Sequence, residues 1–250
     1  MKSHCLILFI ISPIWVHSQS ITKIQDLSPK SILDEQIIDH FGYSLSYNED
    51  HEQANWIFYE LTDYEVSGTV KRKNQFRSDP KVKTASASLS DYRGSGYDRG
   101  HLAPAADMKW SVTTMSESFY MSNMSPQRPS FNRGIWKRLE EQVRLWAINN
   151  KSIYVVTGGV LEDELETIGV NEVSVPEYFY KVILDYIEPE LKGVGFIIPN
   201  KRSNERLINF AVSVDSVEIS SGIDFFYLLP DSIEKRIESN VNLSEWFDLK

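Results

Sequence analysis

The chain has 250 residues, of which 42% are hydrophobic, 12% aromatic and 24% charged. These proportions exclude a disordered or collagen-like protein, and the length allows a buried core that needs no disulfide or structural metal. The formal net charge of −9 argues against a protein whose whole surface is coated with phosphate-binding cations.

The first 18 residues have the pattern of an export signal. Lys2 provides a positive start, residues 6–16 are mainly apolar, and Val16-His17-Ser18 resembles a cleavage site. A membrane anchor is the alternative, but Ser12-Pro13 interrupts a stretch that is shorter than the roughly 20 residues of a spanning helix. We expect cleavage after Ser18 and export to the periplasm or the medium. Cleavage would also remove Cys5, the only cysteine, so neither a disulfide nor a multi-thiolate zinc site is expected.

The rest of the chain is expected to form one domain, residues 19–250, because it contains no repeat, linker or second long apolar run. In chain order, the patterns predict strands over 42–47 and 55–61, a mostly irregular segment over 67–100, a helix over 130–149, strands over 153–160, 178–185 and 193–198, and a helix over 231–239. Strands without regular helix alternation indicate an α+β fold with a mixed, mainly antiparallel sheet core.

The helix over 130–149 has the clearest periodicity. Ile135, Leu139 and Val143 recur every four residues, and Trp136 and Trp146 lie on the same flank. This face is expected to be buried against the core.

Positive charge gathers in one part of this acidic chain. Residues 71–109 hold nine basic and four acidic side chains, and residues 128–146 hold five basic and two acidic ones. A solvated loop is the simplest explanation of such a run. Because the first segment also contains His101 in a suggestive neighbourhood, we expect a surface that binds a polyanion.

The sequence Asp98-Arg99-Gly100-His101 brings together groups suited to attack on a phosphodiester. Histidine is a base near neutral pH, glycine allows close approach of the backbone, and arginine pairs with phosphate oxygens.

Asn132 and Glu140 are a candidate cation site. Eight residues of regular helix separate two side chains by about 80°, so both can face one side of the helix. An amide oxygen and a carboxylate that acts through water suit a hard cation. The alternatives are that Asn132 or Ser130 caps the helix and that Glu140 pairs with a neighbouring lysine or arginine.

Three ordered motifs support a family resemblance: Tyr-Asp-Arg-Gly-His-Leu-Ala-Pro at 97–104, Ser-Asn-Met-Ser-Pro-Gln at 122–127, and Asn-x3-Trp-x2-Leu-Glu at 132–140. The chain resembles the DNA/RNA non-specific endonuclease family, the ββα-metal (His-Me finger) nucleases that include secreted bacterial nucleases and mitochondrial endonuclease G. The resemblance extends from about residue 40 to residue 235 and implies a ββα-metal active-site motif within the α+β fold.

This resemblance implies an enzyme that hydrolyses phosphodiester bonds of DNA and RNA with little sequence specificity and leaves 5′-phosphate ends. His101 would activate the attacking water. Asn132 would ligate Mg2+, for which Mn2+ or another divalent cation could substitute, and Glu140 would hold the metal through water. The remaining matched residues would position groups in the site (Asn123) or bind the substrate phosphate (Arg72, Arg99, Arg144).

Two other functions fit the same residues less well. A non-catalytic nucleic-acid-binding relative would use the basic segment without cleavage, and a nuclease toxin would have a dedicated inhibitor. DNA and RNA are the expected partners, with a homodimer and an inhibitor protein as further ones. No membrane partner is expected after removal of the signal.

Overall fold

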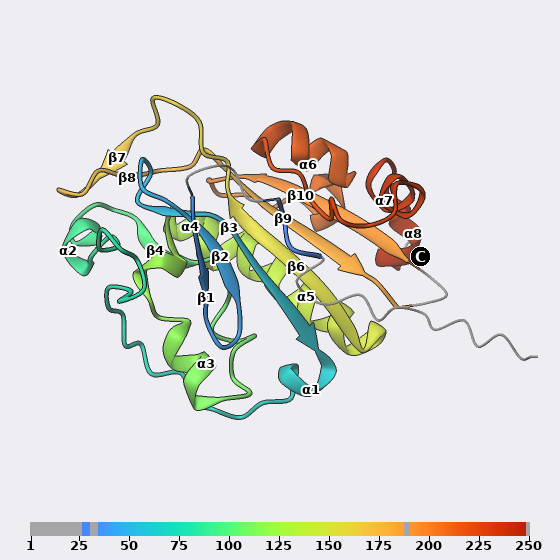
Figure 1. Ribbon diagram of the computed structural model, residues 1–250, viewed down its shortest axis with the longest axis horizontal. Helices are drawn as coiled ribbons and strands as arrows, with labels where there is room; N and C mark the ends of the chain where they lie inside the picture. The colour runs from blue at the N-terminus through green and yellow to red at the C-terminus, as the bar shows by residue number, and fades with distance from the viewer. Residues whose placement is uncertain (1–26, 31–34, 188–190, 249–250) are drawn as a thin grey trace, which may run out of the picture.

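A seven-stranded antiparallel sheet is the centre of the protein in the computed structural model, which describes residues 27–30, 35–187 and 191–248. Its strands lie in the order β1-β2-β3-β6-β9-β10-β11 (Figure 1). Their bounds are β1 Gln36–Asp39, β2 Ser44–Asn48, β3 Gln53–Thr62, β6 Ser152–Gly159, β9 Tyr178–Asp185, β10 Lys192–Pro199 and β11 Ala211–Val212. The expected export signal lies outside the described residues. Within the described ranges, no helix is long and apolar enough to cross a membrane.

The strand β9 shows why the centre of the sheet is so apolar. Side chains alternate between the two faces of a strand. Phe179 and Ile183 belong to the hydrophobic cluster on one face, whereas Tyr180 and Val182 belong to the cluster on the other. Both faces of the sheet are therefore covered, and the near-continuous run of apolar residues is the result.

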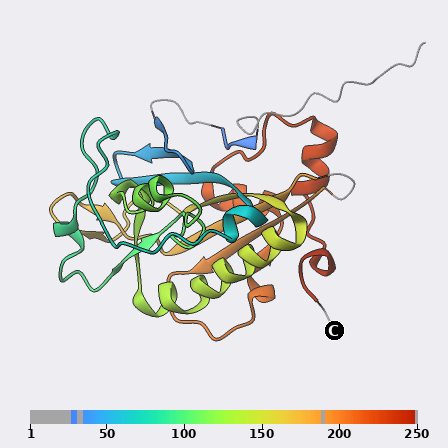
Figure 2. The ribbon, with the colours of Figure 1, turned by 90° about the horizontal axis from the view of Figure 1, so that it is seen from below.

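Helices cover the two faces unequally. The helices are α1 Asp63–Val66, α2 Leu89–Tyr92, α3 Val112–Glu117, α4 Pro129–Phe131, α5 Lys137–Asn150, α6 Val214–Ser221, α7 Asp231–Glu238 and α8 Leu243–Trp246. The long helix α5 lies along one side of the sheet (Figure 2), where Leu139 and Val143 join the cluster of Phe179. Val217 of α6 and Ile237 of α7 join the opposite cluster.

A smaller unit beside the sheet combines two strands with a helix. The strand β4 (Asp98–His101) pairs antiparallel with β5 (Met124–Gln127), and α4 follows β5 almost at once. A π-helical turn over Asn132–Trp136 then continues into α5. This ββα arrangement and the antiparallel sheet confirm the predicted α+β fold class. A second strand pair, β7 (Thr167–Ile168) with β8 (Val173–Ser174), packs against this unit, since Ile168 and Val173 share a hydrophobic cluster with Met124 of β5.

The predicted strands and helices agree with the structure to within two residues at each end, but one predicted helix is divided and several elements, among them β1, β5 and α3, were not predicted. The helix predicted over 130–149 consists of α4, the π-turn and α5, because the backbone of Gly134, with φ of −108° and ψ of −110°, leaves helical geometry and kinks the chain there. The helix α6 was not predicted. Its apolar periodicity is weak, and its ends are set by a Ser213 cap on the Ser216 N–H and by left-handed Gly222, with φ of 69°.

The last residue of α7, Glu238, is a buried acid in the layer opposite α5. It is 5% exposed, and its carboxylate oxygen lies within 4.8 Å of those of Asp215 and Glu218. Burial, and then the charges of neighbouring carboxylates, raise the pKa of Glu238 to about 9 from an ordinary value of 4.5. Between these two values the folded protein holds a proton that the unfolded chain has released, so stability falls as the pH rises.

The Glu238→Gln side chain is neutral at every pH. We therefore expect the melting temperature of this variant to fall less than that of the wild type as the pH rises from about 5 to about 9. Circular dichroism melts in EDTA would measure this. The exposed control Glu162→Gln should follow the wild type. An equal loss in Glu238→Gln and in the wild type would contradict the assignment of the raised pKa.

Candidate active site

A cleft of about 400 Å³ opens where β4 meets the helical segment, and we call it the catalytic cleft. Basic, amide, imidazole and carboxylate side chains from distant parts of the sequence line it: Arg72, Arg99, His101, Asn132, Arg133, Lys137, Glu140 and Arg144. Six of the seven predicted site residues are in this set. The exception is Asn123.

His101, the last residue of β4, is buried, and its ring Nε2 has no hydrogen-bond partner among the described residues. Burial, and then the charges of Arg72 and Arg99, lower its pKa to about 3, although a hydrogen bond with the Arg99 backbone raises it. A bond that favours the protonated ring is donated to a carbonyl, so the bonded nitrogen carries the proton. The neutral ring thus keeps an unprotonated Nε2.

Two phenylalanine rings support the cationic side of the cleft. The guanidinium carbon of Arg99 lies 4.4 Å from the Phe76 ring centroid, and that of Arg72 lies 5.0 Å from the Phe119 centroid. Both rings also contact the His101 ring, with centroids 5.7 and 5.0 Å away. In the described part of the chain neither arginine forms an ion pair with a carboxylate. Their charge is therefore free for an anionic ligand.

Asp98 connects the strand to the helix. Its Oδ2 accepts a hydrogen bond from Asn132 Nδ2 at 2.9 Å, and Arg133 Nε and Nη2 donate to the same carboxylate at 2.9 and 2.6 Å. The amide nitrogen of Asn132 is thus engaged, and its oxygen is the polar atom that remains for a ligand. The capping alternatives are wrong, because the helix begins after Arg128 and Pro129 occupies its first position.

A kink separates Asn132 from Glu140. The backbone of Gly134, with φ of −108° and ψ of −110°, is not helical, so the offset of about 80° of a regular helix does not describe the two side chains. Both side chains nevertheless line the same cleft.

Glu140 lies above a buried set of charged groups. Arg144, its neighbour one turn on, donates to Asp107 at 2.8 Å, and Tyr59 donates to the same carboxylate at 2.9 Å. Lys137 pairs with Glu141 instead, so the alternative in which Glu140 is a helix ion-pair partner is wrong. Glu140 is left available to the cleft.

Lys181 of β9 faces α5 from beneath Glu140. Its side chain is fully buried, its Nζ has no hydrogen-bond partner among the described residues, and it lies 4.8 Å from the Trp136 ring centroid. Burial raises the pKa of Glu140, and the Lys181 charge lowers it. The two opposite charges therefore stabilise one another's ionised forms.

Asn123 holds the backbone next to His101 and is fully buried. Its Nδ2 donates to the carbonyls of Ala103 and Ser118, at 2.9 and 2.8 Å, and its Oδ1 accepts from the Ala103 N–H at 2.8 Å. With each polar atom engaged by the backbone, Asn123 fixes the segment that follows β4 and does not face the cleft.

The other two histidines of the described ranges lie outside the cleft. His40 Nε2 lies 2.8 Å from Asp79 Oδ2, and His51 Nδ1 lies 2.8 Å from Ser174 Oγ. Each ring is thus engaged in a contact of the scaffold.

Phe76, Phe119, Asp107 and Lys181 support the cleft but were not among the predicted site residues. The sequence does indicate a role for Lys181, because a lysine in an otherwise apolar strand is buried and needs a nearby negative charge. It gives no such indication for Phe119, because an aromatic residue in an apolar stretch is normally part of the core. Phe76 is instead the one aromatic residue of the polar, basic stretch 71–80.

Comparisons with known proteins point to one family of nucleases. Residues 26–232 match the profile of a family described as DNA/RNA non-specific endonuclease. The chain is 32% identical to the mitochondrial nuclease EXOG of Mus musculus over 239 residues, which cover 83% of this chain and 65% of that relative. It is 34% identical to the mitochondrial endonuclease G of Homo sapiens over 205 residues, which cover 76% of this chain and 69% of that relative.

A solved structure is also similar. The crystal structure of the EndoG/EndoGI complex matches with a TM-score of 0.73 and 35% identity, and the match covers 78% of this chain and 86% of that one. The chain spans about two thirds of the length of the two mitochondrial relatives.

We expect Lys181→Met to raise the pH at which Glu140 titrates, because the substitution removes the positive charge that lowers the pKa of this carboxyl. NMR titration of 13C-labelled glutamate carboxyls would measure the shift, with Glu140 identified by its absence in Glu140→Gln. Lys235→Met, on an exposed turn of α7, is the control. An unchanged titration in Lys181→Met would mean that the lysine does not act on Glu140.

Proposed function

This chain belongs to the DNA/RNA non-specific endonuclease family, and we propose that it is a metal-dependent endonuclease that hydrolyses DNA and RNA with little sequence specificity. One observation carries the proposal. The catalytic cleft holds the His101 ring nitrogen Nε2, which has no hydrogen-bond partner among the described residues, together with the Arg72 and Arg99 guanidinium groups, which form no ion pair there.

His101 is proposed as the general base. Hydrolysis forms a bond between a water oxygen and phosphorus and breaks the bond from phosphorus to the 3′ oxygen, and Nε2 takes the proton that the water loses. A pKa near 3 makes the ring a weak base in the free protein. A bound phosphate would offset the charges of Arg72 and Arg99, which lower that pKa, and would thereby strengthen the base.

Arg99 and Arg72 are proposed to bind the scissile phosphate. Their guanidinium groups rest on phenylalanine rings and can pair with phosphate oxygens as negative charge develops. Arg144 also lines the cleft, but its Nη1 donates to Asp107, so we assign it a secondary contact. Asn123 is proposed to position the His101 segment.

The family is divalent-metal-dependent, and the residues of the cleft suit a hard cation. Asn132 retains its amide oxygen, and Glu140 has no ion-pair partner on its helix. We propose that Asn132 ligates Mg2+, replaceable by Mn2+ or another divalent cation, and that Glu140 holds it through water. When bound, the cation would stabilise the negative charge on the leaving 3′ oxygen, which leaves a 5′-phosphate end.

Export, assembly and inhibition are further parts of the proposal. The pattern of residues 1–18 supports export to the periplasm or the medium. The similar EndoG structure is a complex with EndoGI in which EndoG is inhibited, and a protein inhibitor of this chain is proposed by analogy. A homodimer is also proposed. Cleavage of nucleic acid would separate the enzyme from a non-catalytic binding relative.

We expect His101→Ala to lower turnover by roughly 10²- to 10⁴-fold while nucleic-acid binding remains, because only the proton acceptor is lost. Nicking of supercoiled plasmid and cleavage of structured RNA, each in Mg2+ and in EDTA, would measure it. His51→Asn, outside the cleft, is the control. Equal cleavage by His101→Ala and the wild type would reject the base assignment.

Asn132→Ala should raise the Mg2+ concentration that gives half-maximal activity, since it removes the proposed direct ligand. Activity titrated with metal would be compared with Asn149→Ala, the same change on the exposed side of α5. Thermal melts would verify that both variants fold. If both variants require the same Mg2+ concentration as the wild type, Asn132 has only its structural bond to Asp98.

A further inference from the structure

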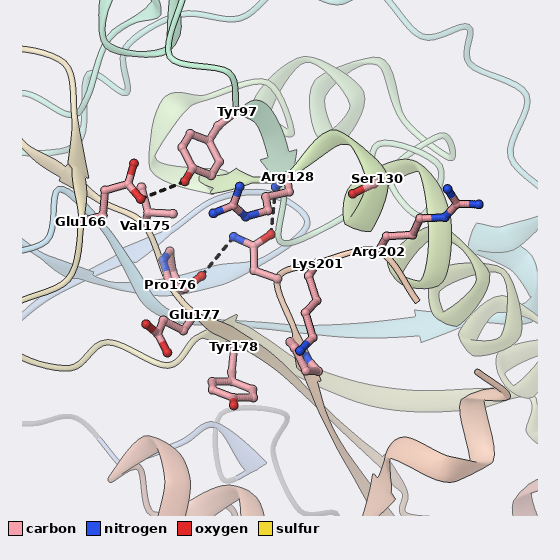
Figure 3. Close-up of a pocket in the computed structure, with 12 residues that line it drawn as sticks. Tyr97, Arg128, Ser130, Glu166, Val175, Pro176, Glu177, Tyr178, Lys201 and Arg202 are labelled. Atoms are coloured by element: carbon pink, nitrogen blue, oxygen red, sulfur yellow. Dashed lines mark hydrogen bonds between the residues drawn. The ribbon is translucent and has the colours of Figure 1, made fainter. Parts of the chain in front are cut away.

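A second cavity, of about 550 Å³, lies near the catalytic cleft but shares none of its residues. We call it the distal cavity. Figure 3 shows the side chains around it. They come from Tyr97, which immediately precedes β4, from the start of α4, from the start of β9 and from the segment after β10. The residues used here are two tyrosines and three cations: Tyr97, Tyr178, Arg128, Lys201 and Arg202.

A buried asparagine holds the frame of the distal cavity. Asn200 is 5% exposed, and its Nδ2 donates to the carbonyls of Pro126 and Pro176 at 3.1 and 3.0 Å. Its Oδ1 accepts from the backbone N–H of Arg128 at 2.8 Å. One side chain thus ties together the segments that carry Arg128, Tyr178 and Lys201, so the cavity is formed before a ligand arrives.

The cations of the distal cavity are available to an anion. Arg128, Lys201 and Arg202 are exposed, and none forms an ion pair within the described ranges. Glu166 and Glu177 also line the cavity, and Glu166 accepts a hydrogen bond from the Tyr97 hydroxyl. The lining therefore has one more basic than acidic group, in a chain whose net charge is −9.

The same cavity presents flat aromatic surfaces. The guanidinium carbon of Arg128 lies 5.5 Å from the Tyr97 ring centroid, and the Tyr178 side chain is 42% exposed. Aromatic rings and arginine planes stack on unpaired bases, whereas a duplex hides its base faces. A pocket with both cations and rings suits a single-stranded nucleotide.

A hollow beside the catalytic cleft lies on the side of the segment that follows the distal cavity. Arg133 and Lys137 line both this hollow and the cleft. Ser203 and Asn204 line its other side and directly follow Arg202 of the distal cavity. Arg138 Nη2 donates to the Glu205 carbonyl at 2.9 Å and fixes this segment against α5. The hollow has three basic side chains and one acidic side chain, Glu141, so a strand that leaves the cleft in this direction would pass a surface with an excess of positive charge.

We propose that the distal cavity is a subsite for single-stranded nucleic acid, which binds a nucleotide several positions away from the scissile phosphate. The proposal rests on the proposed nuclease function. Lys201 and Arg202 would contact phosphates, and Tyr178 and the Arg128–Tyr97 pair would stack on a base.

The test is the affinity of the full chain in a His101→Ala background for labelled single strands of about 20 and about 4 nucleotides. Lys201→Gln/Arg202→Gln should weaken binding of the longer strand roughly tenfold and lower the slope of log K against log salt by about 1.4. The loss should be smaller for the short strand. Tyr178→Leu should also weaken binding, and Tyr178→Phe, which keeps the ring, should restore it.

The matched control is Lys235→Gln/Arg236→Gln, an exposed Lys-Arg pair on α7 that lines neither the distal cavity nor the catalytic cleft. Thermal melts would establish that both double variants fold. If both bind the longer strand equally and the unsubstituted chain cleaves nucleic acid, the distal cavity is not a subsite and the nuclease proposal stands. If no variant binds and the unsubstituted chain does not cleave, both proposals fail.

Discussion

The geometry of the catalytic cleft depends on the Asp98 carboxylate. This group joins the first residue of β4 to the first two residues of the π-turn through three hydrogen bonds. Two of them come from the Arg133 guanidinium, and such charge-assisted pairs have a strict orientation. The strand that carries His101 and the helix that carries Glu140 are therefore held in one register, and the Asn132 oxygen is held with them.

The cations of the cleft differ in what supports them. Arg72 and Arg99 rest on aromatic rings, and no carboxylate of the described residues forms an ion pair with them. Arg144 also lines the cleft but is bonded to buried Asp107, and Lys181 lies in the core below Glu140. Two cleft arginines are thus left for an anionic ligand, which explains how a net charge of −9 is compatible with an anion-binding site.

Much of the architecture could be predicted because the signals are local. The apolar run over 178–185 defines β9, and the four-residue spacing of Ile135, Leu139 and Val143 defines the helix that covers one face. The helix α6 escaped prediction because its limits are set by one serine cap and one left-handed glycine rather than by periodicity. The π-turn escaped for another reason: the kink at Gly134 changes the path of the helix without changing its hydrophobic pattern.

The sequence by itself determined the family, the α+β class and six residues that meet in one cleft, since motif chemistry and periodicity are properties of neighbouring residues. The tertiary structure alone decided the state of those residues. In the tertiary structure, Nε2 of His101 has no hydrogen-bond partner among the described residues, the Asn123 side chain is bonded to backbone groups, and Lys181 lies beneath Glu140. Such outcomes depend on burial and on partners that are distant in the sequence, such as Ala103 for Asn123 and Trp136 for Lys181, and no local pattern encodes the distance between them.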